Sequence, residues 1–129
     1  MSPGPRLFSI LRQGATLIAS VHTALDDSQM ERFREDLVDR IGRDRARGVV
    51  IDVAALDVID SFATRTLRQI TEMARLRGAR TVVVGIQPDV AFVIVRLGMD
   101  TGSLVTALDL EEGLEYLAAR AVPSAGAAR

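Results

Sequence analysis

Apolar residues in the first third of the chain follow a strand pattern and then a helix pattern. Two short β-prone runs, 7–11 and 15–21, lie on either side of a polar turn and predict a hairpin or two adjacent strands. After them, apolar residues recur every three or four positions, as on one face of a helix. These residues are Met30, Phe33, Leu37, Val38 and Ile41. Asp26 and Gln29 have the spacing of a capping box before this helix, and Gly42 is suited to end it.

The middle of the chain alternates between strand and helix patterns. Continuous apolar runs at 49–53 and 81–86 predict two strands that are buried on both faces. Between them we expect a helix that begins around Asp60-Ser61 and ends at Gly78. The residues expected on its inner face are Phe62, Leu67, Ile70, Met73 and Ala74.

Three further elements complete the pattern. Pro88 suits the first turn of a helix and Gly98 suits its end, while residues 103–107 predict a short strand. Asp109 and Glu112 have the spacing of a second capping box, before a last helix. The apolar residues expected on this helix are Leu110, Leu114 and Leu117.

Strands that alternate with helices from residue 49 onward predict βαβ crossovers and parallel pairing. With the hairpin included, we expect one α/β domain whose central sheet is mixed and mainly parallel, with about five strands and about four helices. The domain is expected to span residues 1–121, and residues 122–129 are expected to form a disordered tail.

Composition excludes most enzyme chemistries. The chain lacks cysteine, its 16 basic residues are all arginine, and His22 is its single histidine, which we interpret as an ordinary strand-end residue. Disulfides, thiolate nucleophiles, lysine Schiff bases and multi-histidine metal sites are therefore excluded. A net charge of −1 gives little support for nucleic-acid binding. No apolar run approaches the ~20 residues needed to cross a bilayer. We thus expect a cytoplasmic protein without a cofactor or membrane partner.

Three carboxylates, Asp52, Asp57 and Asp60, bracket the turn that follows the strand at 49–53. Parallel α/β sheets bind ligands at this end of their strands, and carboxylates can hold magnesium. A small phosphatase that uses Asp52 or Asp60 is one interpretation. The other, which we favour, is a strand-end aspartate, a loop aspartate and a helix cap.

Arginines form two groups. The first lies around the end of the first helix and is interleaved with Asp39 and Asp44, which predicts a solvated surface. Its members are Arg40, Arg43, Arg45 and Arg47. The second lies on the next helix and its end, with Glu72 as the sole acid. Its members are Arg65, Arg68, Arg75, Arg77 and Arg80. This face either binds an acidic partner or is simply solvated, and the sequence leaves both open.

Ser61 stands where a buried strand leads into a helix. Free N–H groups and the helix dipole at such a start would stabilise a phosphate on Ser61. Arg65, one helical turn along, is placed to reach that phosphate. Serine and aspartate are also common capping residues, so the residues alone leave a capping role and a phosphorylation site open.

Three segments together resemble the STAS domain, the fold of bacterial anti-sigma factor antagonists. The first is Val49-Val-Ile-Asp52, followed after seven residues by Asp60-Ser61-Phe62. The others are Gly78-Ala-Arg-Thr-Val-Val-Val-Gly85-Ile-Gln-Pro88 and Leu97-Gly98-Met. Over roughly residues 6–120, the chain is most similar within this family to stressosome scaffold proteins of the RsbS type. The resemblance implies that a partner-switching kinase phosphorylates Ser61.

The resemblance further implies a non-enzymatic scaffold that joins RsbR-type paralogues in a large assembly. Such a scaffold sequesters an RsbT-type serine kinase, releases it when Ser61 is phosphorylated, and is reset by a PP2C-type phosphatase. The residues expected to bind these partners are Asp57, Asp60, Phe62, Arg65, Gln87 and Pro88.

Two features favour the scaffold over the sensor members of the family. RsbR-type proteins carry an N-terminal sensor domain, for which this chain leaves no room, and a second phosphoacceptor threonine in the third helix. Residues 90–95 contain no hydroxyl. The alternative in the binding class is a direct anti-sigma factor antagonist that binds an anti-sigma kinase, and the magnesium-dependent phosphatase remains a third hypothesis.

Overall fold

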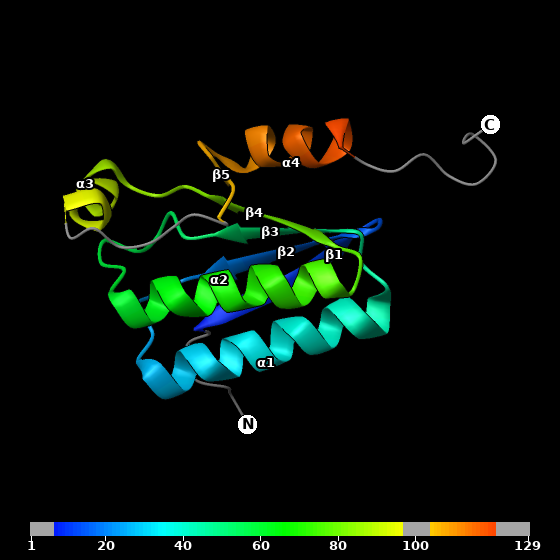
Figure 1. The fold of residues 1–129 in the computed structure, drawn as a ribbon, viewed down its shortest axis with the longest axis horizontal. Helices are drawn as coiled ribbons and strands as arrows, with labels where there is room; N and C mark the ends of the chain where they lie inside the picture. Colours follow the sequence, from blue (N-terminus) through cyan, green and yellow to red (C-terminus); the bar gives the residue numbers. More distant parts are fainter. Residues whose placement is uncertain (1–6, 97–103, 121–129) are drawn as a thin grey trace, which may run out of the picture.

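The fold is a mixed five-stranded sheet with helices on both faces (Figure 1). The computed structural model describes residues 7–96 and 104–120. The strands are β1 (Phe8–Gln13), β2 (Thr16–Val21), β3 (Gly48–Asp52), β4 (Arg80–Val84) and β5 (Thr106–Ala107). The helices are α1 (Asp27–Asp44), α2 (Ser61–Leu76), α3 (Pro88–Arg96) and α4 (Leu110–Ala119). The predicted α/β architecture is confirmed.

The strands lie in the order β1-β2-β3-β4-β5 across the sheet. β1 and β2 form an antiparallel hairpin, one of the two arrangements that the sequence left open, and Gly14 adopts a φ of 62° in its turn, a left-handed conformation that suits glycine. β2, β3, β4 and β5 pair in parallel. Because α1 and α2 connect parallel neighbours, they lie on the same face of the sheet, and α4 lies on the other (Figure 1).

Apolar side chains fill both helix–sheet interfaces. On the α1/α2 face the fully buried residues include Phe33, Leu37 and Ile70, and on the α4 face Val50, Val82 and Val84 pack with Leu117. β3 and the inner part of β4 are buried on both sides, as their continuous apolar runs predict. Within the described residues, no helix is long and apolar enough to span a membrane.

Two capping signals have different outcomes. At α1 the Asp26 carboxylate accepts a hydrogen bond from the Gln29 backbone N–H, and the Gln29 side chain accepts one from the Asp26 N–H. This confirms the first capping box. At α4 the Asp109 carboxylate accepts from the Glu112 N–H, but the Glu112 carboxylate accepts from the N–H of Leu108. The second capping box is therefore incomplete: the Glu112 side chain bonds to the backbone of Leu108, one residue before the cap residue Asp109.

Gly42 does not end α1, contrary to the prediction. The helix continues to Asp44, and Arg45 caps it in a left-handed conformation with a φ of 51°. The side chain of Arg77, the residue that caps the end of α2, lies against this glycine, because a Cβ at Gly42 would lie 2.9 Å from its Nη1 atom. Gly42 thus leaves space for the arginine that follows the neighbouring helix.

The inner face of α2 also differs from the prediction. Met73 is 41% exposed, whereas Thr66, Ile70 and Ala74 are buried at intervals of four residues. The buried face of α2 therefore includes two polar residues, Thr64 and Thr66, that the pattern of apolar residues did not place there. Leu67 and Ile70 are buried as predicted, and Phe62 is half-buried.

Strand and helix ends shift by a few residues. β4 ends at Val84 instead of 86 because Gly85 turns the backbone with a φ of 83°. β5 covers only Thr106–Ala107 of the predicted 103–107, and Leu104 and Val105 lie outside it. The predicted helix end at Gly98 and the predicted tail at 122–129 lie outside the described residues.

Candidate functional site

The loop between β3 and α2 is held in place by three buried apolar side chains: Val53, Leu56 and Ile59. At its start the Asp52 carboxylate accepts a hydrogen bond of 2.9 Å from the Ala54 N–H. Asp57 and Val58 point outward between the anchoring residues and are exposed. The loop is therefore a platform, held by buried side chains, that presents polar residues and one large apolar residue to solvent.

Asp60 caps the helix that follows this loop. Its backbone is extended, and its carboxylate Oδ1 accepts a 2.8 Å hydrogen bond from the Ala63 N–H. Ser61 is the first residue of α2 and is exposed. Since Asp60 supplies the cap, the Ser61 hydroxyl is not needed for it, and it bonds to no other group within the described residues. Of the two roles left open for Ser61, capping is therefore filled by its neighbour.

Two threonines near Ser61 are buried, and their hydroxyls are hydrogen-bonded. Thr64 and Thr66 are 4% and 2% exposed. Their hydroxyls donate to the backbone carbonyls of Asp60 and Phe62, at 3.0 and 2.9 Å. Ser61 is therefore the hydroxyl at this end of α2 that an outside molecule can reach.

A second loop, between β4 and α3, is joined to the first at Ala54. The side-chain amide of Gln87 donates a 2.8 Å hydrogen bond to the Ala54 carbonyl. Gly85 packs against the same residue, because a Cβ at Gly85 would lie only 2.8 Å from the Ala54 Cβ. Pro88 begins α3 as predicted. The two loops are thus joined into one surface beside the start of α2.

The predicted partner-binding residues differ in how exposed their side chains are and in whether they already bond within the chain. Asp57, Asp60 and Arg65 are exposed, and Arg65 has no ion-pair partner in the described part of the chain. Phe62 is half-buried and packs against the core, so only part of its ring faces outward. The amide of Gln87 is occupied by Ala54, which makes it a loop-positioning group.

The arginine groups have several roles. Arg40 pairs with Asp44 and Arg43 with Asp39, at 3.1 and 2.9 Å, in an interleaved charged surface as predicted. On α2, Arg75 pairs with Glu72 at 3.0 Å. Three of the arginines are thus paired with an acidic residue on the same helix.

The carboxylates do not form a metal-binding group. Across 7–96 and 104–120, no three His, Asp or Glu side chains lie close enough together to hold a metal ion. Asp52 and Asp60 instead bind the backbone N–H groups of Ala54 and Ala63. The phosphatase alternative therefore lacks a ligand set in these parts of the chain. His22 is exposed, and its Nε2 forms a hydrogen bond with the Ser9 hydroxyl.

An exposed apolar rim is the feature that sequence reasoning missed. Val90 and Ile94 are the buried residues of α3, while Phe92, Val93 and Val95 are 56%, 47% and 79% exposed. α3 lies at the same end of the molecule as the start of α2 (Figure 1). The signal was present in the sequence, since six consecutive apolar residues cannot all fit the inner stripe of one helix. Such exposed apolar surface is typical of a protein-binding site.

The chain is similar to known proteins of one domain family. The STAS domain family model matches residues 8–112. The structure of a variant of RsbS from Moorella thermoacetica is 36% identical, with a TM-score of 0.75, and the match covers 87% of this chain and 95% of that one. A chain in a structure of the stressosome, described as a signal integration and transduction hub, is 34% identical with a TM-score of 0.69, covering 88% and 100%.

The curated relatives include longer proteins. The RsbT co-antagonist protein RsbRA of Bacillus subtilis is 31% identical over 91 residues, which are 70% of this chain and 33% of that protein. The chain thus matches about a third of the length of that relative. The anti-sigma factor antagonist SpoIIAA is 16% identical with a TM-score of 0.69, a likeness of fold. Since the family model spans most of its length, the chain belongs to the STAS domain family.

Proposed function

We propose that this protein is a non-enzymatic scaffold in a stressosome-like assembly, and that it holds a serine kinase until Ser61 is phosphorylated. One observation carries the proposal: Ser61 presents an exposed hydroxyl at a helix start whose cap is supplied by Asp60. Phosphate can be added there without removing a structural hydrogen bond. The kinase is of the RsbT type, in keeping with the name of the RsbT co-antagonist relative.

The likeness to RsbS and to a stressosome chain supports the assembly part of the proposal. In this assembly the protein joins RsbR-type STAS paralogues, and a PP2C-type phosphatase removes the phosphate and restores kinase binding. The surface that binds the kinase consists of the Ser61 platform and the exposed apolar rim of α3. Protein interfaces combine apolar contacts with polar and charged groups, and this surface offers both.

The switch works through charge. The neutral Ser61 hydroxyl can be covered by a partner at small cost, because free N–H groups of the helix start lie beside it. A phosphate adds about −1.5 to −2 charges at neutral pH. Asp57 and Asp60 are exposed on the same loop, so the phosphate adds to existing negative charge. Arg65 compensates part of that charge in the free protein, which favours the released state.

Phosphorylation by the cognate kinase with ATP tests the proposal, with mass spectrometry to locate the phosphate. We expect one dominant site at Ser61 and no modification in the Ser61→Ala variant. Thr64 and Thr66 serve as internal controls because their hydroxyls are buried and bonded to the backbone. Modification chiefly on either threonine would contradict the proposal. Binding to a kinase that itself sequesters a sigma factor, and not to an RsbT-type kinase, would favour the direct anti-sigma factor antagonist.

A further inference from the structure

A pocket of about 460 Å³ opens where α2 ends and β4 begins, at the end of the molecule away from α3 (Figure 1). Its walls come from elements on both faces of the sheet. The lining residues are Thr71, Glu72 and Arg75 of α2, residues 78–81, Val105, and Tyr116 of α4. Pockets of this size are suited to small organic molecules. None of the residues proposed for the kinase switch lines it.

The short strand β5 leaves one side of β4 open at this pocket. β5 pairs only with Val83 and Val84, so residues 80–82 have no neighbouring strand on that side within the described residues. The Val83 N–H donates to the carbonyl of Val105, just before β5. Because backbone groups of alternate residues point to the same side of a strand, the Thr81 N–H also points to the open side. An open stretch of strand therefore borders the pocket.

Thr81 also contributes a hydroxyl without a partner. Its side chain lies on the same face of the sheet as that of Val83, toward α2, whose Thr71 lines the pocket as well. Thr81 is 5% exposed, and its Oγ1 atom is buried without a hydrogen-bond partner in the described part of the chain. Buried polar groups are nearly always hydrogen-bonded, because burial removes their bonds to water. A molecule in the pocket can supply the missing partner.

The charged residues of the pocket favour an anion. Two arginines and one glutamate line it, and Arg75 pairs with Glu72 at 3.0 Å. Arg80 is exposed and has no ion-pair partner among the residues that the structure describes. A guanidinium group binds a carboxylate through two parallel N–H groups. Arg80 is therefore the cation that an incoming carboxylate meets at the rim.

Apolar and aromatic groups complete the lining. Val105 and Ala79 contribute aliphatic surface, and Tyr116 contributes its ring. The Cζ atom of Arg120 lies 4.0 Å from the centroid of this ring, a cation–π contact that holds the ring in place. Aromatic molecules pack well against tyrosine rings. The pocket thus combines an aromatic wall, a cation at its rim and a buried hydroxyl without a partner.

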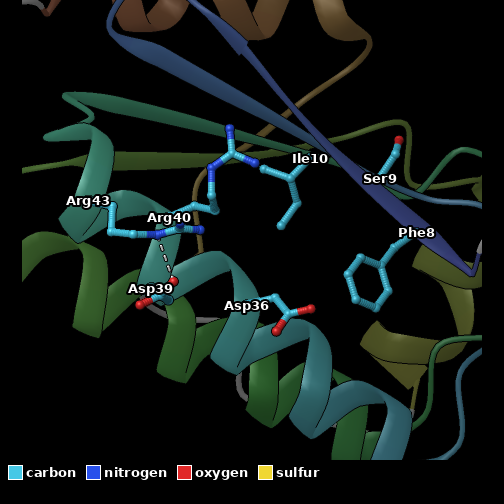
Figure 2. Close-up of a pocket in the computed structure, with 7 residues that line it drawn as sticks. All are labelled: Phe8, Ser9, Ile10, Asp36, Asp39, Arg40 and Arg43. Atoms are coloured by element: carbon cyan, nitrogen blue, oxygen red, sulfur yellow. Dashed lines mark ion pairs between the residues drawn. The ribbon is translucent and has the colours of Figure 1, made fainter.

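The groove between β1 and α1 lacks this combination (Figure 2). Its arginines pair within α1, Arg43 with Asp39 at 2.9 Å and Arg40 with Asp44 at 3.1 Å. No buried side-chain oxygen or nitrogen without a partner lines that groove within the described residues. Unmet binding groups are therefore found at the pocket beside β4 and not at this groove.

We propose that the pocket beside β4 binds a small hydroxyaryl carboxylate, an aromatic molecule with a carboxylate at one end and a hydroxyl at the other. The carboxylate pairs with Arg80 at the rim. The aromatic ring packs against Val105 and Tyr116, and the ligand hydroxyl bonds to the hydroxyl of Thr81. This site gives the protein a small-molecule ligand in addition to the partners of the proposed switch.

An NMR titration of the full chain with para-coumarate, a hydroxyaryl carboxylate, tests the proposal. We expect a Kd of about 1 mM or tighter, typical of a ligand of this size. The backbone amide signals that shift should be those of residues 78–81 and Val105. Cinnamate, which lacks the hydroxyl, and methyl para-coumarate, which lacks the charge, should each bind about tenfold more weakly.

Two variants test the two polar contacts separately. Thr81→Val replaces the hydroxyl with a methyl group and should weaken para-coumarate binding about tenfold, while cinnamate binding stays the same. Arg80→Gln should weaken para-coumarate binding about tenfold or more and leave the methyl ester unaffected. Arg47→Gln is the matched control, because Arg47 is an exposed arginine at the same end of the sheet and does not line the pocket. Its binding should equal that of the unaltered chain.

Thermal unfolding of Thr81→Val excludes a merely structural role for the hydroxyl. Since the hydroxyl has no partner, its replacement by a methyl group should leave the stability unchanged or raise it, and a loss of stability would contradict the proposal. No binding of para-coumarate at about 10 mM, shifts confined to other parts of the chain, or a Thr81→Val loss that cinnamate shares would each overturn it. None of these measurements involves a kinase, so their outcome is independent of phosphorylation at Ser61.

Discussion

Gly85 should be among the least replaceable residues of the two loops that form the Ser61 platform. Its φ of 83° lies in the left-handed region, where a side chain costs about 1–2 kcal/mol. In addition, an added Cβ would lie 2.8 Å from the Cβ of Ala54 and 3.1 Å from its Cα and N atoms. Overpacking of this kind costs about 1–3 kcal/mol. Gly85→Ala should therefore lower the free energy of unfolding by about 2–5 kcal/mol.

Gly78 provides a matched control for the conformational part of this loss. Its φ is 85°, nearly the same as that of Gly85, but no atom lies within 4 Å of an added Cβ. Gly78→Ala should therefore show only the conformational cost of about 1–2 kcal/mol. The difference between the two variants measures the contact with Ala54.

Urea unfolding followed by circular dichroism gives both free energies. Adding Ala54→Gly to Gly85→Ala should recover the part of the loss that comes from the Ala54 Cβ, and it should leave the conformational part and the 3.1 Å contacts with the backbone of residue 54. Equal losses for Gly85→Ala and Gly78→Ala would refute the reasoning, because they would mean that the two loops separate without cost. The same result would remove the rigid connection on which the platform depends.

Two further predictions concern Ser61 and its cap. Ser61→Ala should retain kinase binding but resist release, whereas Ser61→Asp should bind more weakly. If full phosphorylation costs about 2–5 kcal/mol, affinity falls thirtyfold to several thousandfold, and aspartate produces part of that effect. Calorimetric titration of both variants measures this, and equal affinities would contradict the charge switch. Asp60→Ala should cost about 1 kcal/mol of stability through loss of the Ala63 hydrogen bond. Asp57→Ala, which removes an exposed carboxylate without a cap, should cost less than about 0.5 kcal/mol, and thermal unfolding distinguishes the two.

The sequence by itself determined the elements whose signals are local. A capping box needs two side chains three residues apart, and Asp26 with Gln29 forms both of its bonds in the structure. Continuous apolar runs identified β3 and β4, because strands between two helix layers must be apolar on both faces. The position of Ser61 at a helix start follows from the same short-range rules. These signals depend on residues that are close together in the chain, so they hold whichever elements pack around them.

Only the tertiary structure decided the features that depend on residues far apart in the chain. Gly42 lies inside α1 with the side chain of Arg77, 35 positions later, against it, and the Gln87 amide donates to the carbonyl of Ala54 across 33 positions. Which apolar residues of α3 stay exposed likewise depends on where the neighbouring elements end. Hydrophobic patterns report that a side chain is apolar, but its burial is set by the surface available to cover it, which exists only once the sheet and its helices have assembled.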